Sequence, residues 1–286
     1  MNRRTAGRGV VVGEAGVETM KQSAGQKYKK NAIECQKMEG RLKQIDAGIG
    51  LVLGVNSDNK IYILLGKTWT QVPGTLKHVS VGSSGIWGVQ PDNTIHKFVG
   101  GTSWIKVPGS LVQVDAGGDE FVAGVNENDN PYCLNRDPAM NFRSASSETP
   151  WVKVAGVLSY YSCGPIACWG TSHDQRIWLR EWTSPIQCEG TVGDHREWVL
   201  VPGELSMVEV GTDGSVYGVN AEGVVYYRDG ITEFQQAGTQ WVELSEAGKA
   251  KHVSYDLGFL WVITPEEEIL KCAVDEFASQ MTILLS

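Results

Sequence analysis

The chain has 286 residues, of which 42% are hydrophobic, and its formal net charge is −8. Residues 1–33 hold seven Lys or Arg and two Glu, so the rest of the chain has 18 basic and 31 acidic side chains and a net charge of −13. An acidic body repels phosphate backbones, which argues against nucleic acid as a partner. No apolar run approaches the ~18 residues of a membrane-spanning helix, so we expect no membrane span.

Residues 1–33 show neither helical nor strand periodicity. The segment is rich in Gly and Ala, its charges are scattered, and the apolar run Val10–Val12 is too short for the core of a secretory signal peptide. We expect residues 1–33 to be a disordered or atypical leader that lies outside the fold.

A repeat fills residues 34–274. Its copies open with an aliphatic residue followed by a short alternating strand, at Leu42, Leu76, Leu111, Leu158, Leu205 and Ala250. A second landmark, a Trp followed in most copies by Val-Pro-Gly or Val-Ala-Gly, recurs at Trp69, Trp104, Trp151, Trp198 and Trp241, with spacings of 35, 47, 47 and 43 residues. A period in this range, with short strands inside each unit, is typical of a propeller with about four strands per blade.

The copies divide the chain into six units, residues 41–74, 75–109, 110–156, 157–203, 204–248 and 249–274. Gly, Asn, Asp and Ser separate the strands, as tight turns require. Excursions at 136–149 and 183–197 fall at one point of the repeat, which indicates loops on one rim. We predict an all-β, six-bladed β-propeller over residues 34–274, with residues 275–286 as an unassigned C-terminal tail.

The last unit holds only three strands, and the first is preceded by a spare one. Residues 34–40 match the outer-strand landmark without its Trp, because Cys35 stands where Trp104 would and Gly40 where Gly109 would. We expect this N-terminal strand to pair with residues 269–272 and so complete the last blade. Cys35 and Cys272 would then lie on neighbouring strands, where a disulfide forms if the Cα atoms come within about 7 Å.

Four further cysteines, Cys133, Cys163, Cys168 and Cys188, fall in the third and fourth units. We expect the pairs Cys133–Cys163 and Cys168–Cys188, although six cysteines allow fifteen connectivities. A zinc site is the alternative, but Cys163 and Cys168 have no second close pair and no nearby His in finger-like spacing. Disulfides favour a location outside the cytosol.

The sequence gives little support for an enzyme. His78 and His252 occupy one register of the repeat, as structural residues do, and the other three His are isolated. Asp46, Asp115 and Glu209 also share one register, which favours side chains that line the channel or a turn over general acid or base catalysts. No nucleophile elbow or zinc-protease helix is present, so we interpret the chain as a non-enzyme without a metal site or cofactor.

The candidates for ligand binding are aromatic and acidic. The repeat tryptophans, with Trp87, Trp169, Trp261 and Tyr217, are expected in the core, whereas Trp178 and Trp182 fall outside the strict pattern. A Trp near a rim can stack on the apolar face of a sugar. The turns after the inner strands offer acceptors for sugar hydroxyls, and ordinary turn chemistry is the alternative for each: these are Asp119, Glu120, Asp213 and Asp256.

Several of these runs resemble those of the fish-egg lectins, which belong with the tectonin-repeat and horseshoe-crab tachylectin-type propellers. The resemblance spans roughly residues 34–274 and is carried by residues 42–48, 112–119, 131–135, 160–170, 205–216 and 251–258. It implies a secreted six-bladed propeller that binds N-acetylglucosamine-type and bacterial surface sugars, including lipopolysaccharide, in egg or innate defence. The chain departs from the family pattern in residues 1–31, where members carry a signal peptide, and in the lack of a further Cys pair near the last blade.

The first hypothesis is therefore an extracellular lectin whose partners are glycans and bacterial surface polysaccharide. Calcium binding and a homo-oligomeric state are both compatible with such a lectin, and the sequence specifies neither. The alternative is an intracellular tectonin-type propeller that acts as a protein-interaction module, which free thiols would favour.

Overall fold

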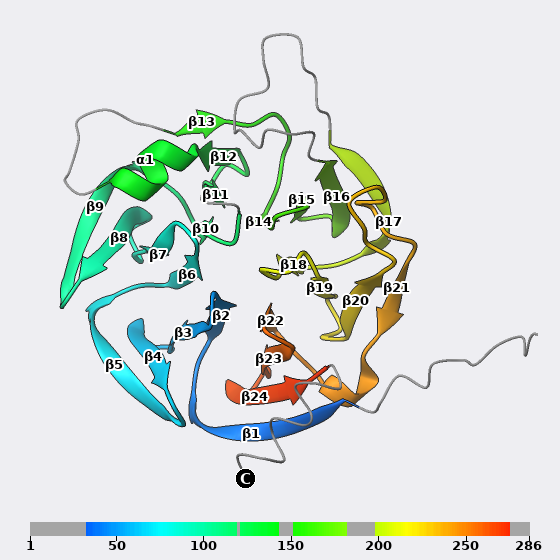
Figure 1. The fold of residues 1–286 in the computed structure, drawn as a ribbon, viewed down its shortest axis with the longest axis horizontal. Coiled ribbons are helices and arrows are strands. Elements are labelled where there is room, and N and C mark those ends of the chain that lie inside the picture. The colour runs from blue at the N-terminus through cyan, green and yellow to red at the C-terminus, as the bar shows by residue number, and fades with distance from the viewer. Residues whose placement is uncertain (1–32, 119–120, 143–150, 182–197, 275–286) are drawn as a thin grey trace, which may run out of the picture. The chain divides into compact units, whose positions relative to one another are not determined.

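The computed structural model describes residues 33–118, 121–142, 151–181 and 198–274. These residues form six antiparallel four-stranded sheets that stand around a central axis like the blades of a propeller (Figure 1). The all-β, six-bladed prediction is confirmed. No helix in the described ranges is long and apolar enough to cross a membrane.

Each blade is a meander that runs from an inner strand to an outer one. Blade 1 comprises β2 (Gln44–Gly48), β3 (Leu51–Val55), β4 (Lys60–Leu65) and β5 (Thr68–Thr75). Blade 2 comprises β6 (His78–Gly82), β7 (Gly85–Val89), β8 (Thr94–Gly100) and β9 (Ser103–Ser110). Blade 3 comprises β10 (Gln113–Asp115), β11 (Val122–Val125), β12 (Pro131–Leu134) and β13 (Val152–Lys153), with the short helix α1 (Arg136–Asn141) after β12.

The second half of the ring follows the same plan. Blade 4 comprises β14 (Tyr160–Cys163), β15 (Ala167–Thr171), β16 (Arg176–Glu181) and β17 (Val199–Glu204). Blade 5 comprises β18 (Met207–Val210), β19 (Val216–Val219), β20 (Val225–Asp229) and β21 (Gln240–Glu243), followed by the 3-10 turn η1 (Ser245–Ala247). Blade 6 comprises β22 (His252–Asp256), β23 (Phe259–Ile263), β24 (Glu268–Ala273) and β1 (Glu34–Arg41).

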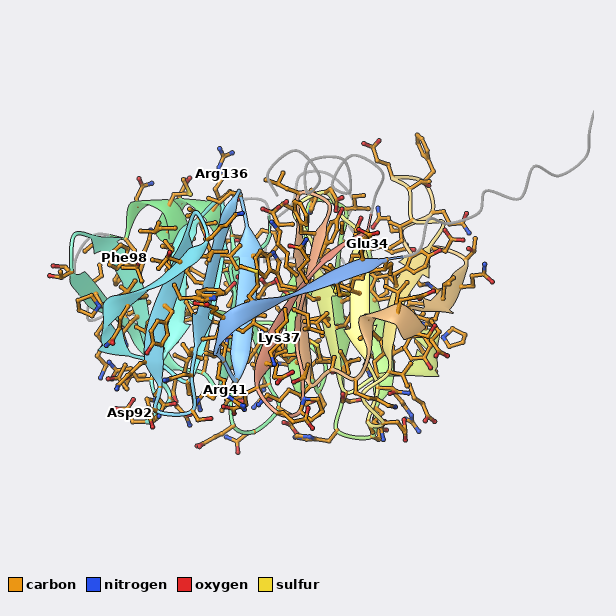
Figure 2. All side chains as sticks on the ribbon, turned by 90° about the horizontal axis from the view of Figure 1, so that it is seen from below. Glu34, Lys37, Arg41, Asp92, Phe98 and Arg136 are labelled. Atoms are coloured by element: carbon orange, nitrogen blue, oxygen red, sulfur yellow. A yellow bond between two sulfur atoms is a disulfide. The ribbon has the colours of Figure 1, made fainter. Side chains whose placement is uncertain are left out.

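The two faces of the propeller carry different turns. The turns between first and second strands, and the segments after third strands, open on the upper face of Figure 2, where Arg136 lies. The turns between second and third strands, and the links from one blade to the next, open on the lower face, where Asp92 lies. The inner strands are almost wholly buried because neighbouring blades cover both sides of them.

The ring closes by its own ends, as predicted. β1 runs antiparallel to β24, and Cys35 lies directly opposite Cys272. The two form a disulfide with a Cα–Cα distance of 3.9 Å, and Lys37 adds an ion pair with Glu268 at 2.5 Å. Because the bridge joins residues 237 positions apart, the chain-entropy model assigns it roughly 5 kcal/mol of stabilisation.

The predicted pairings of the other cysteines are wrong. Cys163 is bonded to Cys168, with a Cα–Cα distance of 4.1 Å, because the hairpin turn between β14 and β15 places the two residues directly opposite each other. Because Cys163 and Cys168 pair with each other, neither Cys133–Cys163 nor Cys168–Cys188 forms. Cys133 is also disulfide-bonded. Cys188 lies outside the described residues, and within those ranges no cysteine is free.

The Trp and Gly landmarks hold adjacent blades together. The indole N–H of Trp104 donates to the Pro73 carbonyl at 2.8 Å, and that of Trp151 to Pro108 at 2.9 Å. A Cβ on the glycine that follows would meet the same indole, at 2.9 Å in the case of Gly109 and Trp151. The Gly-to-Trp contact thus joins the outer strand of one blade to the next blade, which confirms that the repeat tryptophans pack blade on blade.

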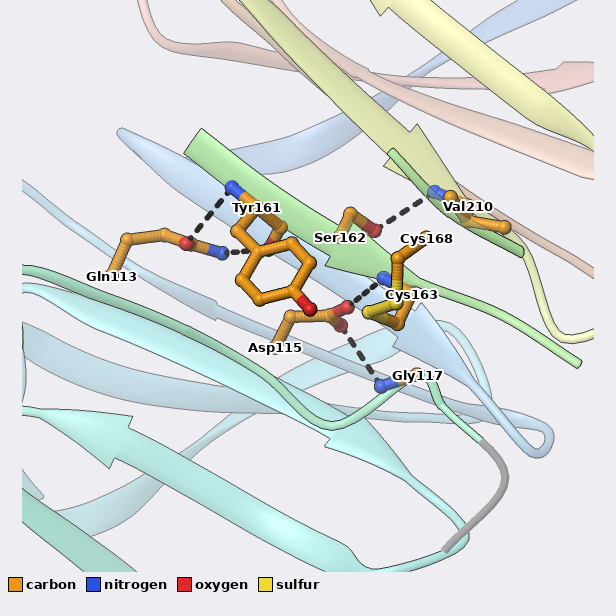
Figure 3. The surroundings of a disulfide bond; sticks show 8 residues. All are labelled: Gln113, Asp115, Gly117, Tyr161, Ser162, Cys163, Cys168 and Val210. Atoms are coloured by element: carbon orange, nitrogen blue, oxygen red, sulfur yellow. Dashed lines mark hydrogen bonds between the residues drawn. A yellow bond between two sulfur atoms is a disulfide. The ribbon is translucent and has the colours of Figure 1, made fainter. Parts of the chain in front are cut away.

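Carboxyl and hydroxyl groups alternate around the inner strands. The third inner-strand residue is Asp46, Asp115 or Glu209 in blades 1, 3 and 5 and Ser80, Ser162 or Ser254 in blades 2, 4 and 6. Most accept a backbone N–H of the following blade, and Figure 3 shows two such bonds, from Cys163 to Asp115 and from Val210 to Ser162. These acids are thus structural links between blades.

Candidate functional site

Three rings occupy the central axis at the start of alternate inner strands. His78 on β6, Tyr160 on β14 and His252 on β22 lie with ring centroids 6.1–6.2 Å apart, each edge-on to the others. The Tyr160 hydroxyl lies 3.0 Å from His252 Nε2 and 3.5 Å from His78 Nε2. The three rings fill the axis and hold one another in place.

The three acids share this interior and are hard to ionise there. Burial raises the pKa of Asp46 to about 6, and burial together with the charge of Asp46 raises that of Asp115 to about 7. Burial and the two neighbouring carboxylates raise the pKa of Glu209 well above its usual value. Burial lowers the pKa of His252 to about 3 and that of His78 well below its usual value, so both imidazoles are neutral at pH 7. Each group is engaged with a neighbouring blade, which favours a structural role over ligand binding.

A pocket of about 500 Å³ opens on the lower face where blades 3 and 4 meet. The link between these blades, Gly156–Leu158, forms one wall, and the β15–β16 turn with Trp178 of β16 forms the other. Ser172 accepts the indole N–H of Trp178 at 3.1 Å, which fixes the orientation of that ring. Trp198 is held in turn, because its indole N–H donates to the Ala155 carbonyl at 2.6 Å.

Polar and charged side chains line part of this pocket. His173 Nε2 lies 3.1 Å from Asp129 Oδ1 and so joins a turn of blade 4 to one of blade 3. Arg176 Nε lies 3.2 Å from Asp174 Oδ2. The Ser172 hydroxyl, followed by the Arg176 N–H, lowers the pKa of Asp174, so this carboxylate is ionised at pH 7 and can accept hydrogen bonds from hydroxyl groups.

An apolar cross-strand pair beside the pocket has no counterpart among the described residues of the other blades. Trp178 lies opposite Leu200 of β17, and cross-strand partners share one face of a sheet. Leu200 is 55% exposed, and Val157 across the junction is 64% exposed. The same pair in the other blades has a polar or charged outer residue: Tyr62–Gln71, His96–Lys106, Tyr132–Lys153, Tyr226–Glu243 and Leu270–Lys37.

A related pocket of about 470 Å³ lies one blade further, between blades 4 and 5. Tyr226 and Trp241 take the places of Trp178 and Trp198, and Gly203 that of Gly156. Glu204 stands where Val157 does, so this second pocket is more polar. The fold therefore repeats one hollow at successive junctions with different linings.

The structure separates the residues that the sequence predicts as sugar contacts. Trp178 lines the pocket on the lower face, whereas Asp213 lies in a turn of the upper face and Asp256 at the upper end of β22. Asp213 is exposed and accepts the N–H of Ser215 at 2.8 Å. Asp256 is buried and accepts the N–H of Gly50 at 2.7 Å and the hydroxyl of Thr212. Asp119, Glu120 and Trp182 lie outside the described residues.

Sequence reasoning missed the residues that surround Trp178. Asp129 and His173 belong to turns between second and third strands, Arg176 begins the third strand of blade 4, and Val157 follows the landmark glycine. The signal was the strand order: in a meander, these turns and the links between blades open on the same face. Within the described ranges, no group of three or more His, Cys, Asp or Glu is arranged to hold a metal ion.

The fold and the repeats define the class of protein. A model of the tectonin domain matches residues 41–265. Over 245 residues the chain is 44% identical to the fish-egg lectin of Cyprinus carpio. The alignment covers 85% of this chain and the whole length of that lectin. The chain belongs to the tectonin-repeat propellers and, within them, to the fish-egg lectins.

Solved structures with little sequence similarity share the propeller fold. The WD40 β-propeller domain of Doa1 has a TM-score of 0.55 at 10% identity, over 87% of this chain and 99% of that one. Virginiamycin B lyase from Staphylococcus aureus has a TM-score of 0.54 at 11% identity, over 85% of this chain and 99% of that one. At such identities the likeness concerns the fold alone.

Proposed function

We propose that the protein is an extracellular lectin that binds N-acetylglucosamine-type sugars and bacterial surface glycans, including lipopolysaccharide, without altering them. The fish-egg lectin relative supports carbohydrate binding, and the disulfides support a place outside the cytosol. Such a protein serves in eggs or in innate defence.

The pocket between blades 3 and 4 is the proposed sugar site. The observation that carries it is the ring of Trp178, which is fixed by Ser172 at the wall of a pocket of about 500 Å³. A partly exposed indole can stack on the apolar face of a pyranose, while Asp174 and Arg176 offer an acceptor and a donor for hydroxyl groups. Val157 lines the pocket, and the exposed Leu200 lies beside Trp178 as its cross-strand partner, so the two offer apolar surface to the methyl of an N-acetyl group.

The geometry suits binding rather than turnover. Asp174 is engaged by Ser172 and Arg176, and His173 by Asp129. The Ser172 hydroxyl donates to Asp174, but the lowered pKa of this carboxylate makes it a weak general base, so the pair does not supply the activated nucleophile that covalent catalysis requires. The enzyme class of one structural neighbour therefore does not carry over to this pocket.

Calorimetric titration with chitobiose, after a glycan array has ranked the ligands, tests the site. Trp178→Ala should weaken binding roughly tenfold, because a stacking contact contributes on the order of 1 kcal/mol beyond its buried area. Tyr62→Ala, at the same repeat position in blade 1 and beside Gln71, is the matched control and should leave binding unchanged. Equal affinity of Trp178→Ala and the unmodified protein would exclude this pocket, and an array without any glycan signal would favour the protein-interaction module.

A further inference from the structure

Two hairpin turns on the upper face use residues that their backbone disfavours. Ile49 and Gly50 connect β2 to β3 with φ values of 50° and 80°, and Leu257 and Gly258 connect β22 to β23 with φ values of 49° and 81°. Two successive positive φ angles define the type I′ turn, whose first position favours Asn, Asp or Gly. A branched or bulky aliphatic residue is strained there.

Ile49 and Leu257 differ in residue type from the other described residues that have positive φ angles. The other described non-glycine residues with positive φ are all polar: Asn59, Asn93, Asp129, Gln175 and Glu267. The equivalent upper-face turns of blades 2 and 5 hold Ser83–Ser84 and Thr212–Asp213. Ile49 and Leu257 also stay 53% and 70% exposed, so the strain is not offset by burial in the core. Residues that break a local rule without a structural gain point to a contact made elsewhere.

These two residues form one surface, which we term the apolar turn pair. Blades 6 and 1 are neighbours, and Asp256 accepts the N–H of Gly50 at 2.7 Å. A Cβ on Gly50 would lie 3.7 Å from Leu257 Cδ1, so the Leu257 side chain extends over the turn that carries Ile49.

The C-terminal segment begins beside this pair. β24 ends at Ala273, and the N–H of Val274 donates to the Gly258 carbonyl at 3.0 Å, in the same turn as Leu257. Twelve residues follow in the sequence, and residues 281–285 read Met-Thr-Ile-Leu-Leu. Seven residues of extended chain reach up to about 23 Å, which allows this run to return to the turn from which it departs. Attachment to the same chain keeps its effective concentration near the millimolar range.

We propose that the apolar turn pair is the docking surface for the C-terminal segment, whose apolar run covers Ile49 and Leu257. The occupant follows from the place where the chain leaves β24 and from the match between two exposed aliphatic side chains and the four apolar residues among 281–285. The apolar turn pair lies on the upper face, opposite the proposed sugar pocket, so an occupant of the pair leaves that pocket open.

Amide hydrogen exchange read by mass spectrometry tests the proposal on the full chain. The variant Ile49→Asn with Leu257→Asn creates Asn-Gly at both turns, the dipeptide that type I′ turns prefer, so it should fold at least as well. Peptides from residues 275–286 should exchange at least tenfold more slowly in the unmodified protein than in this variant. Ser83→Asn, in the equivalent turn of blade 2, is the control and should keep the protection.

Three results would overturn the proposal. The first is unprotected exchange of residues 275–286 in the unmodified protein, or equal protection in the double Asn variant. The second is dimerisation that depends on Ile49 and Leu257 in a chain truncated after Val274, seen by sedimentation, which would make a second copy the occupant. The third is equal binding of the full and truncated chains to phosphatidylcholine vesicles through the same two residues, which would make it a lipid surface.

Discussion

At the scale of single residues, the landmark glycines combine two requirements. Gly109 has a φ of 120°, and a Cβ there would lie 2.9 Å from Trp151, whereas Gly100 has a φ of 109° with nothing within 4 Å of its Cβ position. The backbone conformation is similar and only the contact differs. A comparison of substitutions at Gly109 and Gly100 therefore separates the cost of backbone strain from the cost of disturbed packing between blades.

Gly109→Ala should lower the free energy of unfolding by about 1–3 kcal/mol more than Gly100→Ala, because only the former pushes an indole away from its place. Urea denaturation followed by tryptophan fluorescence measures both. Equal losses for the two variants would show that the Gly-to-Trp contact contributes nothing beyond backbone strain.

Leu200, the cross-strand partner of Trp178 beside the proposed sugar pocket, differs in chemistry from its counterparts in the other blades. Leu200→Lys introduces the residue type found at this position in blades 2 and 3, as Lys106 and Lys153. Because Leu200 is half exposed, stability should change by less than about 0.5 kcal/mol. Affinity for chitobiose should fall about fivefold relative to cellobiose, which lacks the N-acetyl groups. Titrations with both disaccharides check this, and a parallel loss for both would contradict the role of Leu200 in recognising the methyl group.

At the scale of elements, the inner strands hold titratable groups whose folded pKa values have moved in opposite directions. Asp46, Asp115 and Glu209 have raised pKa values, so the folded state holds protons that the unfolded state has released. Their contribution to stability is lost as pH rises through the folded pKa values, about 6 and 7 for the two Asp. His78 and His252 have lowered pKa values, so acid below pH 6.5 favours the unfolded state. The two effects oppose each other below pH 6.5, and above it only the acids act.

The free energy of unfolding should therefore fall between pH 6.5 and 8, where Asp115 and Glu209 still hold protons in the folded state. Asp115→Asn keeps an acceptor for the Cys163 N–H but cannot ionise, so it should flatten this fall. Urea midpoints at intervals of half a pH unit give the profile, with exposed Asp58→Asn as the control. A midpoint that rises steadily to pH 8 in the unmodified protein would contradict the assignment.

A second prediction at the scale of elements concerns the disulfide that joins β1 to β24. Cys35–Cys272 spans 237 positions and Cys163–Cys168 only five, so the chain-entropy model predicts that the first bridge contributes about 3 kcal/mol more. Replacing each pair with Ala and measuring guanidinium denaturation compares them. Loss of the first pair should also speed amide exchange in β1 and β24. Equal costs and an unchanged exchange rate would argue against covalent closure as a stabilising device.

How far the sequence predicts these elements depends on how local their causes are. Strand alternation and turn residues lie within each repeat, and a missing strand at one end with a spare one at the other specifies that β1 pairs with β24. The pairing Cys163–Cys168 depends on the register of the β14–β15 hairpin, which the positions of the cysteines in the sequence do not specify. The pocket around Trp178 combines Asp129, Val157 and Arg176, which are distant in sequence and meet only when blade 4 packs on blade 3.

At the scale of the whole molecule, the propeller presents two different faces. The lower face repeats one hollow at successive junctions, and the lining changes from Val157 and Trp178 to Glu204 and Tyr226. The upper face carries the turns with Asp213, Asp256 and the apolar turn pair. Trp178 lines a pocket on the lower face, whereas Asp213 and Asp256 lie at the upper face. One sugar therefore cannot contact all of the residues that the sequence predicts.

The central claim is that a sugar binds at the junction of blades 3 and 4 on the lower face. A crystal structure of the protein soaked with chitobiose tests it most directly. We expect a pyranose ring against Trp178, an N-acetyl methyl near Leu200 or Val157, and hydroxyl groups within hydrogen-bond distance of Asp174 or Arg176. Sugar density beside Asp213 on the upper face, with the pocket at Trp178 empty, would contradict it.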